Sequence, residues 1–100
     1  MGEPYAEAAI HESLGWATFQ LGRRERALEH FRLAAGLYED LGDGFNQAKT
    51  LVRCGDAHAS AHDAESAAVA WSAALDILRA LDHPDAATVS AKLDGVKLPG

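Results

Sequence analysis

The sequence predicts an all-α protein in which two helical hairpins and a C-terminal capping helix form an α–α superhelix. Three observations lead to this fold class. The chain repeats itself at an interval of forty residues. Its apolar residues recur at spacings of three and four, which is the period of a helix face. Apolar residues make up 48% of the chain, and many of them are alanine, the strongest helix former, while valine and isoleucine are few.

The repeat is visible when the chain is compared with itself after a shift of forty positions. Small and large side chains then coincide in the same order, in the pairs Gly15–Gly55, Ala27–Ala67, Phe31–Trp71, Ala34–Ala74 and Leu41–Leu81. A third, shorter copy begins near Asp85 and ends at Gly95, which matches the first two glycines. Each copy is therefore expected to be one hairpin of two helices.

The first copy is expected at about residues 5–42, with its first helix over about residues 6–20. The apolar residues expected to pack from that helix are three or four positions apart: Ala6, Ile10, Leu14, Ala17 and Leu21. The second helix repeats this spacing with Ala27, Phe31, Ala34, Tyr38 and Leu41. Both stripes are expected to face the core.

The second copy is expected at about residues 45–82, with its first helix over about residues 45–60. Its second helix carries a matching stripe of Ala67, Trp71, Ala74, Leu78 and Leu81. A capping helix at about 84–95 completes the predicted domain 1–95, and residues 96–100 are expected to form a flexible tail.

The expected helix ends carry suitable residues. Gly22 and Gly42 each follow a leucine and can supply the left-handed residue after the last helical turn. Asp63 can cap the fourth helix by accepting hydrogen bonds from its free amides. Pro84 lies where its missing N–H costs nothing, in the first turn of the last helix.

The spacing resembles that of the tetratricopeptide repeat (TPR) family. Leu14-Gly15 followed by Ala27 and Phe31 fits the family pattern in the first copy, and Gly55, Ala67 and Trp71 fit it in the second. The resemblance implies that the small residues let paired helices touch and that each aromatic fills the gap to the next repeat. Several positions depart from the pattern: His11 and Leu51 replace a tryptophan, Thr18 and His58 replace a tyrosine, and the closing proline is absent. The period of forty also exceeds the family's usual length of about 34 residues.

A closer resemblance covers most of the chain. The segments that carry it are 51–58, 70–78, 81–86 and 91–93. They are similar to the C-terminal TPR segment of large actinobacterial transcriptional regulators of the antibiotic-regulatory (SARP) class, which also carry a winged-helix domain and a STAND-type NTPase. The resemblance implies a sensor or regulatory role through contact with a protein. The DNA-binding and nucleotide-binding functions of those other domains are not implied for this chain.

Composition and charge argue against several functions. The formal net charge of −6 disfavours direct contact with nucleic acid or with an anionic membrane. No apolar run approaches the length of a membrane span, and no secretion signal precedes the first helix. The one cysteine, Cys54, cannot form an internal disulfide. We therefore expect a cytoplasmic protein.

The pattern Cys54, His58 and His62 is the most suggestive of chemistry. Thiolate and imidazole are zinc ligands, and the three residues are four apart on one expected helix. Three such residues span about 12 Å, however, so one tetrahedral ion cannot reach all of them. We expect them to be structural and keep a metal-binding or hydrolytic site as the alternative. No nucleophile elbow or phosphate-binding loop is present, so we expect no enzyme activity and no cofactor.

The expected function is protein–protein interaction through the concave side of the superhelix. The candidate residues lie on the first helix of each copy and on the last helix: Glu12, Trp16, Phe19, Lys49, Val52, Arg53, Asp56, Val89 and Lys92. Trp16 and Phe19 lie off the expected packing stripe, so they are the expected anchors for an apolar, acidic segment of another protein or of another domain of the same regulator. The alternatives are that both rings pack on a further repeat, or that exposed repeat ends make the chain a homo-oligomer.

Overall fold

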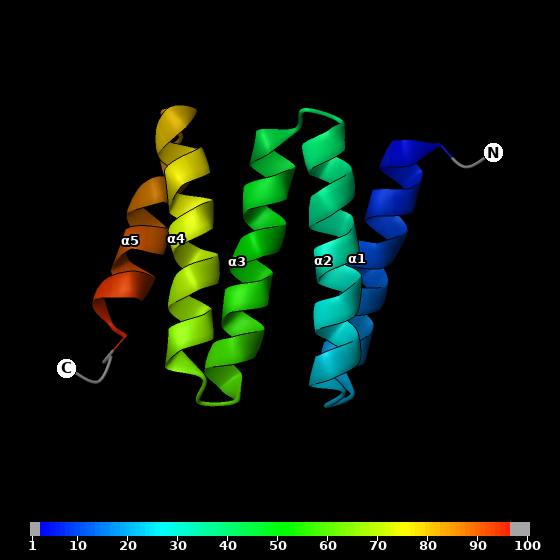
Figure 1. The fold of residues 1–100 in the computed structure, drawn as a ribbon, viewed down its shortest axis with the longest axis horizontal. Coiled ribbons are helices and arrows are strands. Elements are labelled where there is room, and N and C mark those ends of the chain that lie inside the picture. The colour runs from blue at the N-terminus through cyan, green and yellow to red at the C-terminus, as the bar shows by residue number, and fades with distance from the viewer. Residues whose placement is uncertain (1–2, 97–100) are drawn as a thin grey trace.

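The computed structural model describes residues 3–96, and every regular element among them is a helix. Figure 1 shows these helices side by side in chain order: α1 (Pro4–Gln20), α2 (Arg24–Asp40), α3 (Gly44–Ser60), α4 (Ala64–Ala80) and α5 (Asp85–Asp94). Each helix packs against the next one along the chain. The predicted all-α fold of two helical hairpins and a final helix is therefore confirmed. Residues 1, 2 and 97–100, which include most of the expected tail, lie outside the described residues.

The connections between helices share one backbone conformation. Gly22 and Gly42 have φ angles of 79° and 72°, as the sequence predicted. His62 and Asp82 adopt the same left-handed conformation, with φ angles of 62° and 52°. A non-glycine residue there pays a steric cost, so these two positions were not recognisable as left-handed from residue type. The left-handed residue recurs at the same point of each tight connection, which keeps successive helices antiparallel.

Acidic side chains cap three of the helices. The Glu3 carboxylate accepts from the Tyr5 and Ala6 amides at 3.1 and 3.0 Å, at the start of α1. Asp43 accepts from the Asn46 amide at 3.0 Å at the start of α3. The predicted cap of α4 is present, because Asp63 accepts from the Ser66 amide at 3.2 Å. These bonds satisfy amides that have no partner within their own helix.

The two hairpins close in the same way. Within the first, a Cβ atom added to Gly15 would lie 2.6 Å from the ring of Phe31, so only glycine lets the ring lie against α1. The ring of Trp71 lies in the same place over Gly55 in the second hairpin. Ala27 and Ala67, one turn before the aromatic residues, have no exposed surface. The small residues that the sequence singled out are thus the points of closest helix contact.

The aromatic residues also join the repeats to one another. Phe31 belongs to a buried cluster that includes Cys54 and Ala57 of the next hairpin. Trp71 belongs to a second cluster that includes Val89 of α5. Val96 is half-buried against that cluster, so the first residue of the expected flexible tail is packed.

The expected packing stripe of the first helix is wrong. Ile10, Leu14 and Leu21 are 56%, 42% and 70% exposed, and Ala6 and Ala17 are exposed as well. The buried residues of α1 are the small ones, Ala8 and Gly15. There are two reasons. Helix α2 packs closely against the side of α1 that carries Ala8 and Gly15, where only small residues fit. Among the described residues, no further helix covers the opposite, apolar stripe. Apolar spacing located the stripe, but it could not say whether a neighbour covers it.

Among residues 3–96, no helix is both long enough and apolar enough to cross a lipid bilayer.

Candidate functional site

Side chains of α1, α3 and α5 meet on one surface, which we call the α1–α3–α5 face. Arg53 of α3 reaches Glu12 of α1, and Lys92 of α5 reaches Asp56 of α3. These contacts bring most of the candidate residues from the sequence into two linked groups. One lies between α1 and α3, and the other lies between α3 and α5.

Glu12 is the centre of the group between α1 and α3. Its carboxylate accepts from the hydroxyls of Tyr38 and Thr50, each at 3.4 Å, and lies 3.9 Å from Nε of Arg53. Burial raises the pKa of the Tyr38 hydroxyl, and the neighbouring Glu12 charge raises it further. These contacts occupy Glu12, so its role is to tie α1 to α2 and α3 more than to offer a free carboxylate to a partner.

Trp16 remains available on this side, whereas Phe19 does not. Trp16 is 47% exposed, and the guanidinium of Arg53 lies 5.0 Å from the centroid of its ring, within cation–π range. Phe19 lies 6.1 Å from Trp16 between ring centroids but is half-buried against the Phe31 cluster. The two expected anchors therefore differ. Trp16 is exposed and available to a partner, whereas Phe19 packs against the core beside it.

The group between α3 and α5 lines a groove of about 210 Å³. It contains four of the candidate residues, Lys49, Val52, Val89 and Lys92. The sequence did not assign the remaining lining residues to a binding surface; they are Phe45, Leu78, Asp85 and Thr88. For Phe45, the sequence offered one indication of a site residue: Phe45 matches another aromatic residue, Tyr5, in the forty-residue register.

The groove has a mainly apolar lining, and its charged lining residues are Lys49, Lys92 and Asp85. The ammonium of Lys49 lies 5.9 Å from the Phe45 ring centroid, and that of Lys92 lies 5.6 Å from the Trp71 ring centroid. Lys92 also contacts Asp56 at 3.1 Å, and Asp56 accepts from Trp71 Nε1 at 3.2 Å. Asp56 is thus held by internal partners, while Lys49 makes no ion pair among the described residues.

The size of the groove limits what it can bind. Sites for small molecules usually measure about 300–1,000 Å³ and enclose their ligand. This groove is smaller and open, so it suits one or two apolar side chains of a peptide. Lys49, which makes no ion pair among the described residues, favours a peptide with acidic neighbours, whereas Lys92 is already paired with Asp56.

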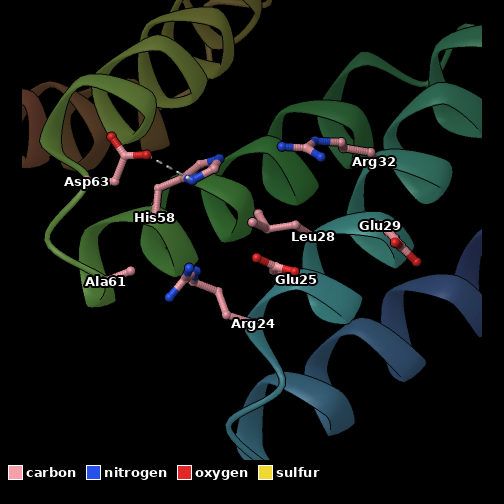
Figure 2. A pocket seen from close by; sticks show the side chains of 8 residues that line it. All are labelled: Arg24, Glu25, Leu28, Glu29, Arg32, His58, Ala61 and Asp63. Carbon is pink, nitrogen blue, oxygen red and sulfur yellow. Dashed lines mark ion pairs between the residues drawn. The ribbon is translucent and has the colours of Figure 1, made fainter.

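A larger depression of about 560 Å³ lies between α2, the end of α3 and the start of α4, and Figure 2 shows its lining. The cationic side chains Arg24 and Arg32 face it, together with His58. Glu25, Glu29 and Asp63 supply opposite charge, so the depression favours neither sign of ligand. Burial lowers the pKa of His58, although the Asp63 carboxylate 3.9 Å away opposes that shift.

The predicted trio Cys54, His58 and His62 is not assembled into a site. Cys54 is buried in the Phe31 cluster, and burial raises the pKa of its thiol to about 11, which keeps it protonated at neutral pH. His58 faces Asp63, and His62 lies in the turn after α3 instead of on the helix. Within residues 3–96, no three histidine, cysteine or acidic side chains are placed to hold one metal ion.

No family model, curated protein or solved structure matches this chain.

Proposed function

We propose that this chain is a TPR-type protein–protein interaction scaffold. The observation that carries the proposal is the groove between α3 and α5, which combines an apolar lining with Lys49 and Lys92 at its edges. Support for the TPR assignment comes from the hairpin packing, in which Phe31 lies over Gly15 and Trp71 lies over Gly55. Stacked hairpins of this type present one continuous surface on which an extended or helical peptide can lie.

The proposed partner is a peptide segment with one or two apolar side chains flanked by Asp or Glu. The apolar side chains enter the groove at Val52 and Val89, and the acidic ones approach Lys49, while Lys92 beside them is held by Asp56. Trp16, stacked on Arg53, extends the same surface over α1. Large exposed aromatic rings and arginines are the residue types most often found as binding anchors.

The resemblance to bacterial transcriptional regulators gives this scaffold a biological setting. We propose that it is the C-terminal sensor or regulatory end of such a regulator in the cytoplasm, and that its partner is another protein or another domain of the regulator. Direct binding to DNA is no part of the proposal, because the chain has a formal net charge of −6.

Peptide selection on the immobilised chain tests this function. A random peptide library should yield sequences that combine apolar and acidic residues. Amide NMR shifts on titration should be confined to residues of α1, α3 and α5 and to the neighbourhood of Leu78, which lines the groove from α4. Lys49→Glu should weaken binding of the selected peptide roughly tenfold or more, because it reverses charge at the groove edge. Trp16→Ala should weaken binding too, while leaving the free energy of unfolding within about 1 kcal/mol.

Arg79→Glu is the matched control, because Arg79 is an exposed cation on α4 that does not line the groove. It changes net charge by the same amount as Lys49→Glu and should leave binding nearly unchanged. Equal losses in both variants would show a non-specific charge effect, and selected peptides without acidic residues would contradict the proposed partner.

A further inference from the structure

Two histidines meet where the helices of the first hairpin pack together. His11 lies on α1 and His30 lies on α2, and their Nδ1 atoms are 3.1 Å apart. The ring centroids are 5.4 Å apart and the ring planes are inclined by 29°, so the rings meet through these two nitrogens. Both residues are half-buried, and neither lines the groove between α3 and α5.

The second hairpin shows that packing alone does not require histidine at these positions. In the forty-residue register, Leu51 matches His11 and Ala70 matches His30. The same hairpin architecture therefore closes with two apolar side chains at this point. Two imidazoles there carry a desolvation cost for their nitrogens, which a ligand shared by both nitrogens offsets. The pair of histidines thus indicates a role other than packing.

The position stays open to solvent even where a preceding helix is in place. Leu51 and Ala70 line an open groove of about 350 Å³ between α3 and α4, and Arg32 of the preceding helix α2 lines it as well. A preceding helix thus lies beside this position without closing it. Access to His11 and His30 therefore does not depend on which residues come before α1.

The distance between the two nitrogens matches that between two ligands of one metal ion. Zinc lies about 2.0–2.1 Å from histidine nitrogens in tetrahedral sites, which places two such nitrogens about 3.3 Å apart. When both rings are neutral and no ion is bound, one Nδ1–H donates to the other Nδ1. On binding, the donating ring carries its proton on Nε2 instead, and both Nδ1 lone pairs coordinate the ion. The ion lies beside the line that joins the nitrogens, so both rings turn towards it.

We propose that His11 and His30 form a two-histidine site for a divalent transition-metal ion such as Zn²⁺ or Cu²⁺, which links α1 to α2. Imidazole nitrogen suits these ions, whereas Mg²⁺ prefers oxygen ligands. Two protein ligands leave the other coordination positions to water, so binding is weaker than in a zinc site with four protein ligands. The ion binds the folded hairpin and therefore stabilises it. The site shares no residue with the proposed peptide surface and stands apart from that proposal.

Isothermal titration calorimetry and thermal melting of the full chain with Zn²⁺ and Cu²⁺ test the site. The wild type should bind one ion per chain, and its Tm should rise with metal concentration but not with Mg²⁺. The double variant His11→Leu, His30→Ala carries the residues of the second hairpin at both positions, so it should keep the helical circular dichroism spectrum. Its metal affinity should fall roughly tenfold or more, and its Tm should no longer respond to metal. A wild type whose Tm ignores metal, or a double variant with unchanged affinity, overturns the proposal.

Three further variants show whether one ion is shared by the two rings. His11→Leu and His30→Ala should each lose most of the affinity, because a single imidazole remains. His62→Asn is the matched control: it removes an exposed imidazole from the turn after α3, and asparagine tolerates the left-handed conformation there. It should bind metal as the wild type does. Cu²⁺ should broaden NMR signals around both His11 and His30. Broadening centred on His58, or an equal loss of affinity in His62→Asn, would place the ion elsewhere and overturn the proposal.

Discussion

The first helices of the two hairpins, α1 and α3, have the same length and register but opposite environments. Thr50 and Cys54 of α3 are buried, whereas Ile10 and Leu14, at the matching positions of α1, are 56% and 42% exposed. At these positions of the first helix of a hairpin, a residue is buried when a preceding helix covers it. Its own apolar character does not decide whether it is buried. A face that is core in one repeat is free for a partner in another.

The second helices, α2 and α4, differ much less. Phe31 and Trp71 occupy matching positions and are 1% and 6% exposed. Each lies over the glycine of its own hairpin and contacts the helix that follows. These helices have neighbours on both sides in both copies, so the shared sequence pattern gives the same packing as far as Tyr38 and Leu78. At the end of the predicted stripe of α4, however, Leu81 is 50% exposed, so its expected place in the core is wrong. The contrast between first and second helices can be tested by making the same change at matching positions.

The largest effects are expected at the aromatic residues. Phe31→Ala and Trp71→Ala should each lower the free energy of unfolding by about 3–5 kcal/mol, because each leaves a cavity where two repeats meet. Phe31→Ala should cost at least as much as Trp71→Ala, since its cluster joins the two hairpins. Urea denaturation followed by circular dichroism measures both. An unchanged midpoint in either variant would mean that the hairpins do not pack in this register.

Alanine at the paired glycines should have the next largest effect. Gly15→Ala and Gly55→Ala place a methyl group against the Phe31 and Trp71 rings, and each should cost about 1–3 kcal/mol despite the better helix propensity of alanine. Gly36→Ala is the matched control on α2, because a Cβ atom there meets nothing within 4 Å. It should stabilise the protein by about 0.5–1 kcal/mol. A stabilising Gly15→Ala would show that the helices are not in close contact there.

Acid should weaken the second hairpin through the caps of its two helices, α3 and α4. The pKa of Asp43 is lowered by hydrogen bonds from Asn46, and that of Asp63 by hydrogen bonds from Ser66. Because the folded-state values lie below the ordinary value of 3.8, the caps contribute fully above that pH. Their contribution is lost as the pH falls through the folded-state values. Thermal melts between pH 5 and pH 2 should show this loss, and the Asp43→Asn, Asp63→Asn double variant should show a shallower pH dependence. Equal slopes in the two proteins would contradict it.

The sequence predicted the fold where local pattern decides structure. The glycines, alanines and aromatics at matching positions gave the hairpin register, because their sizes alone determine how closely two helices approach. The prediction of burial failed for Ile10, Leu14 and Leu21, because apolar periodicity identifies a helix face but does not show whether another helix covers it. His62 and Asp82 were missed as left-handed residues, since residue type favours that conformation strongly only for glycine.

The candidate site was predictable only in part. Lys49, Val52, Val89 and Lys92 were assigned to one surface from the repeat register, and in the structure they line one groove. Leu78 could not be assigned to the groove from sequence, because it belongs to the packing stripe of α4. In the structure it is a buried core residue that also lines the groove. The bond between Lys92 and Asp56 likewise depends on how α5 packs beside α3, which no local pattern specifies.

The central claim is that the apolar stripe of α1 is free, whereas the matching stripe of α3 is covered by α2. The most direct test makes one substitution on the α1 stripe and the same substitution on the part of α2 that packs with Cys54 and Ala57. Leu14→Ala and Leu28→Ala remove the same atoms from a 42% exposed and a 6% exposed leucine. Denaturant unfolding at a concentration where the chain is monomeric should show a loss of about 2–5 kcal/mol for Leu28→Ala and of about 1 kcal/mol or less for Leu14→Ala. Losses of equal size would place Leu14 in the core of this chain and contradict the claim.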